Sequence, residues 1–259
     1  MIVLRTAGTN CDRETVFAFE NGGAQTEAVH INQLFEKKRS LADYHVLAIP
    51  GGFTYGDDIM AGRILANELR LRLGDELKAF IRDGKLVIGI CNGFQVLVRA
   101  GFLPGPCQAA GEIQSVTLTN NDSGKFEDRW VHLKRSGRCV WTDGLDDVLF
   151  MPVAHAEGKF VPRDQSVLRN LKENGQVVFR YTNARGEPGT YPVNPNGSLD
   201  DIAGITDTTG RVLGMMPHPE RHYLREHHPF WTRLKPTSSL GAGASIFKNG
   251  LRYVKEKLS

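Results

Sequence analysis

The chain has 259 residues, of which 41% are hydrophobic and 24% are charged, so it is long and apolar enough to form a folded core. Its length is typical of one α/β domain, and we predict a single domain over residues 1–259. The net charge is only +3, and no apolar run is long enough for a signal peptide or a membrane span, so we expect no nucleic acid and no membrane among its partners. The four cysteines are scattered without a disulfide spacing, which favours a cytoplasmic, reducing location.

Strand and helix patterns alternate through the first hundred residues. We predict strands over 2–5, 27–31, 46–49 and 86–90, and helices over 14–20, 64–73 and 76–82, with Asp75 as the N-cap of the last helix. This alternation predicts an α/β fold with a mostly parallel sheet flanked by helices. Functional residues are then expected at the carboxyl ends of the strands.

The pattern changes between Ile113 and Val153, where short β-like runs are separated by turn residues. We interpret this region as an antiparallel β excursion on the parallel core. The runs 177–181 and 212–216 are expected to return to the sheet, and an amphipathic helix is predicted over 245–258.

Cys91 follows the apolar run 86–90 within the pattern G-x-C-x-G, which is a nucleophile elbow with sulfur in place of oxygen. Phe94, Leu97 and Val98 recur at helical spacing after it, and Gly101 is placed to end that helix. The positive end of the helix dipole would then stabilise a negatively charged sulfur. A buried, inert cysteine is the alternative, but the flanking glycines favour a nucleophile.

A partner for this sulfur is expected in the segment Met215–Arg221, where prolines on both sides of His218 exclude a helix interior. In extended backbone, residues two apart point to the same side, so Glu220 would orient the imidazole of His218 towards the thiol. A surface ion pair and a structural histidine are the alternatives for these residues taken singly. Metal binding is not expected, because the chain contains no H-E-x-x-H or C-x-x-C motif.

A third element is the apolar run 46–49, which ends in Pro50-Gly51-Gly52. The N–H of Gly52, together with the N–H of Asn92 directly after the nucleophile, would form an oxyanion hole with two donors. An ordinary glycine turn after a strand is the alternative.

These three elements resemble the class I, triad-type glutamine amidotransferases. More closely, the chain resembles the glutaminase subunits of the synthases that convert formylglycinamide ribonucleotide into its amidine in purine biosynthesis. The matching stretches are 8–12, 50–58, 89–95, 123–127, 151–160, 194–198 and 215–221. Two stretches, 162–172 and the residues after Arg221, are longer than in the compact form of this subunit.

The resemblance implies a flavodoxin-like fold and assigns a role to each matching residue. Cys91 would be the nucleophile, His218 the general base and acid, and Glu220 the orienting carboxylate. The N–H groups of Gly52 and Asn92 would hold the oxyanion. The remaining expected substrate contacts are Gln95, Asn196, Gly197 and Ser198.

The resemblance also implies the reaction and the partners. Glutamine would be hydrolysed through a cysteine thioester, and the ammonia would pass to a large synthase subunit, with a small third subunit as a possible member of the complex. No cofactor is expected in this chain; ATP and Mg are expected on the partner, because no Walker A motif is present. Two rival interpretations stay open, which are a cysteine hydrolase or peptidase that acts alone and a non-catalytic relative.

Overall fold

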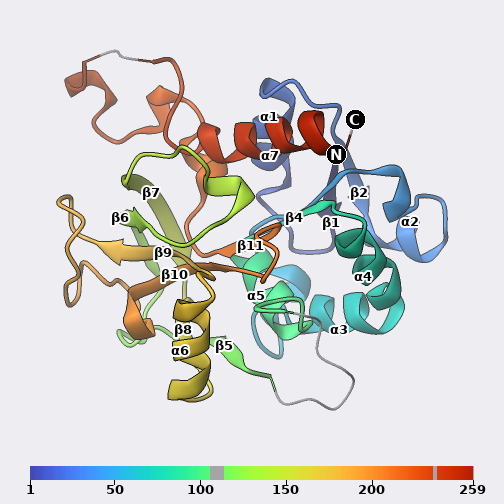
Figure 1. Cartoon of the computed structure of the whole chain (residues 1–259), viewed down its shortest axis with the longest axis horizontal. Helices are drawn as coiled ribbons and strands as arrows, with labels where there is room; N and C mark the ends of the chain where they lie inside the picture. Colours follow the sequence, from blue (N-terminus) through green and yellow to red (C-terminus); the bar gives the residue numbers. More distant parts are fainter. Residues whose placement is uncertain (106–113, 236–237, 259) are drawn as a thin grey trace.

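The computed structural model describes residues 1–105, 114–235 and 238–258 (Figure 1). Its main feature is a nine-stranded sheet with the order β2-β1-β3-β4-β11-β10-β9-β6-β7. A separate antiparallel pair is formed by β5 (Val116–Thr119) and β8 (Lys159–Pro162). In the described part of the chain, no helix is both long and apolar enough to cross a membrane.

One half of the sheet is parallel. Its strands are β2 (Glu27–His30), β1 (Ile2–Arg5), β3 (Val46–Ile49), β4 (Leu86–Ile90) and β11 (Val212–Met215). Strands β3, β4 and β11 are buried along their whole length, as expected for parallel strands covered on both faces. Each of these short apolar runs has the composition of a central strand, which is why the sequence predicted them well.

The other half continues the same sheet in antiparallel fashion. It consists of β10 (Ile202–Thr206), β9 (Val177–Thr182), β6 (Glu127–Arg135) and β7 (Val148–His155). The predicted antiparallel excursion is thereby confirmed, and the α/β fold class with it. The predicted starting point of the excursion, Ile113, lies outside the described residues.

Helices cover both faces of the parallel half (Figure 1). On one face lie α1 (Asp12–Asn21) and α7 (Ala244–Lys257), and on the other lie α3 (Arg63–Arg72), α4 (Gly74–Arg82) and α5 (Asn92–Arg99). Helix α4 begins at Gly74, with Leu73 as its N-cap, so the predicted N-cap Asp75 is wrong. Asp75 lies instead in the first turn, where a carboxylate interacts favourably with the helix dipole.

The remaining helices are short or lie outside the parallel half. They are α2 (Ile31–Phe35), α6 (Gln165–Glu173) and the 3-10 turns η1 (Leu41–Asp43), η2 (Thr54–Asp57), η3 (Val140–Thr142), η4 (Leu199–Asp201), η5 (Pro219–His222), η6 (Arg225–His227) and η7 (Trp231–Arg233). Helix α6 was not predicted. It begins inside the stretch 162–172 noted in the sequence and ends at Glu173, and its N-cap is the side chain of Asp164.

Candidate active site

Cys91 stands where β4 turns into α5, and its backbone is strained. Its φ of 51° and ψ of −106° are rare for a residue with a side chain, and such strain is characteristic of functional sites. The Cys91 N–H donates to the carbonyl of Met215 at 2.8 Å, which fixes the elbow to the end of the neighbouring strand β11. The thiol is 5% exposed, and its Sγ lies 3.7 Å from the carbonyl oxygen of Ala154.

The glycines on both sides of Cys91 allow α5 to approach the sheet. A Cβ on Gly93 would lie 1.8 Å from the carbonyl oxygen of Ile49, and a Cβ on Gly89 would lie 2.6 Å from that of Gly93. A side chain at either position would therefore push the helix away from β3 and β4. The G-x-C-x-G pattern is thus explained by close packing of the helix on the strands.

His218 and Glu220 follow β11 and form a short, buried hydrogen bond. The Nδ1 atom of His218 lies 2.6 Å from Oε1 of Glu220, and the two residues are 2% and 1% exposed. Burial alone would lower the pKa of His218, but the carboxylate of Glu220 and the neighbouring Cys91 hold that pKa well above its ordinary value. The electrostatic effect of both Glu220 and Cys91 on His218 places the three residues in one buried cluster. Their roles in catalysis stay predictions.

The ends of three adjacent parallel strands form this cluster. Strand β4 leads to Cys91, and its two neighbours β3 and β11 lead to Gly52 and His218. The carboxyl ends of adjacent parallel strands meet at one edge of the sheet, which is where ligands bind in open α/β sheets.

Strand β7, the last strand in the order of the sheet, hydrogen-bonds to residues of the cluster. Three carbonyl groups at alternate positions on its free edge accept hydrogen bonds. Phe150 accepts from the ring of His222, Pro152 from the N–H of His218, and Ala154 from the thiol of Cys91, at 2.8, 2.9 and 3.7 Å. The segment after β11 thus covers an edge that would otherwise expose unpaired backbone groups.

The two predicted oxyanion donors are available. Gly52 has a φ of +146°, and a Cβ there would lie 2.6 Å from the carbonyl oxygen of Gly8, so only glycine fits. Within the described residues, no group accepts a hydrogen bond from the N–H of Gly52 or from that of Asn92. The N–H of Asn92 directly follows Cys91, and Gly52 follows the neighbouring strand β3, while their role as an oxyanion hole stays a prediction.

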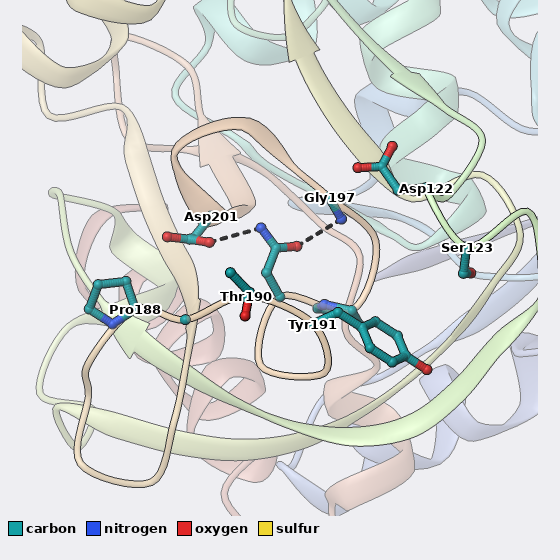
Figure 2. A pocket seen from close by; sticks show the side chains of 10 residues that line it. Asp122, Ser123, Pro188, Thr190, Tyr191, Gly197 and Asp201 are labelled. Atoms are coloured by element: carbon teal, nitrogen blue, oxygen red, sulfur yellow. Dashed lines mark hydrogen bonds between the residues drawn. The ribbon is translucent and has the colours of Figure 1, made fainter.

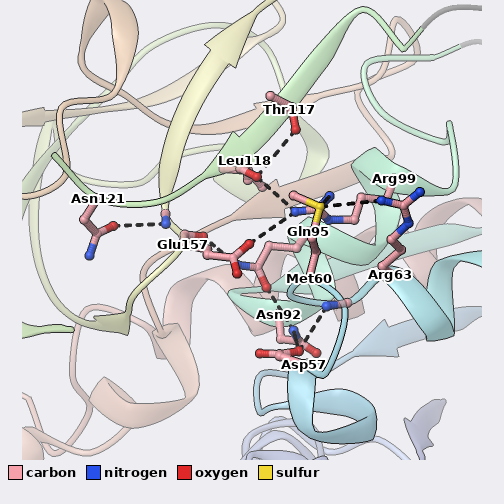
Figure 3. A network of polar contacts seen from close by, with 12 residues as sticks. Asp57, Met60, Arg63, Asn92, Gln95, Arg99, Thr117, Leu118, Asn121 and Glu157 are labelled. Atoms are coloured by element: carbon pink, nitrogen blue, oxygen red, sulfur yellow. Dashed lines mark hydrogen bonds and ion pairs between the residues drawn. The ribbon is translucent and has the colours of Figure 1, made fainter. Parts of the chain in front are cut away.

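The side chain of Asn92 connects the elbow to its surroundings (Figure 3). Its Oδ1 accepts from the N–H and the hydroxyl of Thr54, and its Nδ2 donates to Asp57 at 3.2 Å and to Gln95 at 2.9 Å. The amide of Gln95 donates in turn to the carbonyl of Glu157 at 2.5 Å. Gln95 is therefore already engaged in this network, and its contact with a substrate stays a prediction.

The predicted loop contacts Asn196 and Ser198 are buried and point inward. Asn196 donates to the carbonyl of Gly158 at 2.9 Å and to the hydroxyl of Tyr181 at 3.3 Å, and the hydroxyl of Ser198 accepts from the N–H of Phe160 at 3.0 Å. They hold the turn that follows β7. Gly197 faces outward and borders a hollow of about 800 Å³ that Cys91 does not line (Figure 2).

The structure adds residues to which the sequence assigned no role. A Cβ on Gly51 would lie 2.8 Å from Cε1 of His218, so this glycine makes room for the imidazole. The Sγ of Cys11 lies 3.9 Å from Nδ1 of His218 and accepts from Arg221 at 3.0 Å. Nothing in the spacing of these residues indicates such contacts, because Cys11 and His218 are 207 positions apart.

One group of potential metal ligands is present among the described residues. Cys11, His218 and Glu220 each offer one ligand atom, and these atoms lie within 4.8 Å of one another. A metal ion between His218 and Glu220 would have to displace their 2.6 Å hydrogen bond, so we interpret the group as a hydrogen-bonded cluster.

Comparison with known proteins identifies the class of protein. The model of the CobB/CobQ-like glutamine amidotransferase domain family matches residues 1–254. The chain is a glutamine amidotransferase by this criterion, in agreement with the cysteine elbow and the buried histidine–glutamate pair.

Individual relatives narrow the family further. The chain is 48% identical to phosphoribosylformylglycinamidine synthase subunit PurQ of Dehalococcoides mccartyi, over 98% of this chain and 97% of that protein. It is 42% identical to the subunit of the same name from Methanococcus maripaludis strain S2, over 98% and 96%. Its fold matches a chain from the structure of PurLQS from Thermotoga maritima with a TM-score of 0.72 at 29% identity, over 98% and 97% of the two chains. The chain therefore belongs to the PurQ family of phosphoribosylformylglycinamidine synthase subunits.

Proposed function

We propose that this chain hydrolyses glutamine through a thioester on Cys91 and supplies the ammonia to a synthase partner that converts formylglycinamide ribonucleotide into its amidine with ATP. The observation that carries the proposal is the buried cluster of Cys91, His218 and Glu220 at the ends of adjacent strands. The high identity to PurQ proteins over nearly the whole chain supports it.

The reaction begins with attack of the Cys91 sulfur on the side-chain amide carbon of glutamine. The thiol proton moves to His218, and the negative oxygen of the tetrahedral intermediate is held by the N–H groups of Gly52 and Asn92. His218 then returns the proton to the nitrogen, the carbon–nitrogen bond breaks, and ammonia leaves. Water next attacks the thioester with His218 as the base, which releases glutamate and restores the thiol. Glu220 keeps the proton on Nδ1 throughout, so that Nε2 faces the reaction.

The partner supplies the rest of the chemistry in this proposal. Ammonia released to water would be wasted, so the chain would act in a complex with a large synthase subunit and a small third subunit, as the name of the PurLQS structure suggests for that protein. ATP and Mg would bind the partner. A cytoplasmic location would keep Cys91 reduced, and Cys11, Cys91 and Cys139 are all free thiols.

The test is a reconstituted complex with either glutamine or ammonium chloride as the nitrogen source. Cys91→Ala is expected to abolish amidine formation from glutamine and to leave formation from ammonia intact. The matched control is Cys139→Ala, which removes another buried thiol and should leave both activities. Glutamine-dependent synthesis by the Cys91 variant would overturn the proposal, and hydrolysis of glutamine that never needs the partner would favour an enzyme that acts alone.

A further inference from the structure

His155, at the end of β7, has a ring nitrogen for which the folded chain offers no partner. The side chain is 2% exposed, and its Nε2 is buried without a hydrogen bond to any described residue. Buried polar atoms without a partner are rare, and each one calls for an explanation.

The hydrogen bonds around Asn121 fix which nitrogen of His155 carries the proton. The Nδ2 of Asn121 donates to the carbonyls of Lys125 and His155, at 2.9 and 2.8 Å, so its Oδ1 can only accept. That Oδ1 lies 3.1 Å from Nδ1 of His155. The proton is therefore on Nδ1, and Nε2 presents a lone pair.

The ring is fixed in place beside the catalytic cluster. A Cβ on Gly158 would lie 2.2 to 2.6 Å from three of its atoms, so the turn after β7 closes against the ring. His155 directly follows Ala154, whose carbonyl faces the Cys91 sulfur, and the ring interacts electrostatically with His218. A buried acceptor thus lies on the residue that follows the carbonyl facing the thiol, within electrostatic reach of the imidazole.

The proposed substrate brings hydrogen-bond donors to this place. When the amide oxygen of glutamine lies in the oxyanion hole, the amide nitrogen and its two N–H groups are directed towards His218. Buried donors need acceptors. Two are offered on this side of the site: the carbonyl of Ala154, which faces the thiol, and the unpaired Nε2 of the next residue, His155. We propose that Nε2 of His155 accepts a hydrogen bond from the amide nitrogen of glutamine and then from the departing ammonia. This inference rests on the proposed function.

The charge state of His155 suits this task. Burial, with a smaller contribution from nearby His218, lowers the pKa of His155 to about 3. The ring is neutral at physiological pH, so its Nε2 carries no proton and can accept a hydrogen bond from ammonia. His218 then remains the proton donor, and ammonia leaves uncharged and reactive.

The test compares two leaving groups in the reconstituted complex. Glutamine has N–H donors on its leaving nitrogen and releases ammonia, whereas the ester oxygen of the γ-methyl ester of glutamate carries no hydrogen until His218 protonates it and methanol leaves. We expect His155→Asn, whose amide still reaches Asn121, to lower kcat/KM for glutamine about 10- to 100-fold more than for the ester, which is the loss expected for one buried hydrogen bond. The ratio of the two values does not depend on how much of the protein is folded.

Two further variants make the result decisive. His155→Met, of similar volume and without a strong acceptor, should lower the ratio in the same way if the asparagine variant does not fold. His132→Asn, which alters a half-buried histidine on β6, should leave the ratio unchanged. An unchanged ratio in the His155 variants overturns this inference but not the function, whereas wild-type protein that releases no glutamate from glutamine overturns both.

Discussion

The side-chain oxygen of Asn92 accepts hydrogen bonds from both the N–H and the hydroxyl of Thr54, at 3.3 and 2.7 Å. Asn92 begins helix α5 and is one proposed oxyanion donor, and Thr54 belongs to the loop that carries the other proposed donor, Gly52. The buried amide therefore ties together the two segments that carry the proposed donors. Both of its polar atoms are fully used, because Nδ2 also donates to Asp57 and Gln95.

Asn92→Ala should therefore reduce catalysis and stability together. Loss of an aligned oxyanion donor is expected to lower kcat for glutamine about 100-fold. Each buried partner left without a hydrogen bond should reduce the free energy of unfolding by about 1–3 kcal/mol. Steady-state glutaminase assays and urea unfolding measure the two effects. Thr54→Val is the matched control, because it removes the hydroxyl that donates to Asn92 and keeps the hydrogen bond from the Thr54 N–H. A wild-type kcat in Asn92→Ala would show that the Asn92 amide does not position the proposed donors.

Gly51→Ala should impair catalysis with little effect on stability. The new methyl group would lie 2.8 Å from Cε1 of His218 and 3.2 Å from Sγ of Cys11, so the imidazole must move. A displacement of about 1 Å at a catalytic group costs about 100-fold in rate. The control is Gly74→Ala, where the nearest atom would be 3.9 Å away and alanine favours the helix. Equal kcat in both variants would mean that the site tolerates the shift.

The sequence predicted those parts of the site that depend on short stretches of neighbouring residues. The apolar run 86–90 and the glycines around Cys91 indicate an elbow, and two prolines force the backbone of His218 into an extended form. Strand β4 followed from these patterns. Glu220 does lie against His218, but the predicted reason is wrong: Glu220 belongs to the 3-10 turn η5 and not to extended backbone. Helix α6 was missed although the sequence signals it: Asp164 is a favourable N-cap, and Val167, Leu168 and Leu171 recur at helical spacing.

Other parts depend on contacts between distant segments. The hydrogen-bond acceptors on the edge of β7 cannot be recognised from the sequence. The carbonyls of Pro152 and Ala154 contact His218 and Cys91 only in the folded sheet. His155 lies in the matching stretch 151–160, but the sequence assigned it no role. Its role depends on a hydrogen bond to Asn121 and on the close approach of Gly158, neither of which spacing reveals.

The free energy of unfolding should fall as the pH drops below 6.5, and His155 should account for a separable part of the fall. Its pKa is about 3 in the folded state and about 6.5 in the unfolded state, so between these values only the unfolded chain binds the proton. Stability is then lost by about 1.4 kcal/mol for each pH unit below 6.5. Urea unfolding at pH 7.5, 6.5 and 5.5 should show a smaller fall in His155→Asn than in the wild type.

Other histidines determine the pH dependence of the free energy of unfolding that remains in His155→Asn. Burial lowers the pKa of His132, His222 and His228, so these groups also destabilise the folded state in acid. His218 acts in the opposite direction: its raised pKa stabilises the folded state below pH 6.5, and this contribution is lost as the pH rises through the folded-state value. Identical pH dependence in wild type and His155→Asn would contradict a neutral, buried ring at position 155.

Of the two thiols beside His218, only Cys91 should react with an electrophile. Cys11 faces Nδ1 of His218 at 3.9 Å, but that atom already donates to Glu220 and has no lone pair free to take a proton from Cys11. Burial also raises the pKa of the Cys11 thiol. The buried Nε2 is the position of the imidazole that has no hydrogen-bond partner among the described residues, and in the proposed mechanism it takes the proton of Cys91. Treatment with iodoacetamide at pH 7.5, followed by peptide mass analysis, should modify Cys91 at similar rates in the wild type and in Cys11→Ala. If Cys11 in Cys91→Ala is modified as fast as Cys91 in the wild type, the imidazole activates Cys11 and the prediction is wrong.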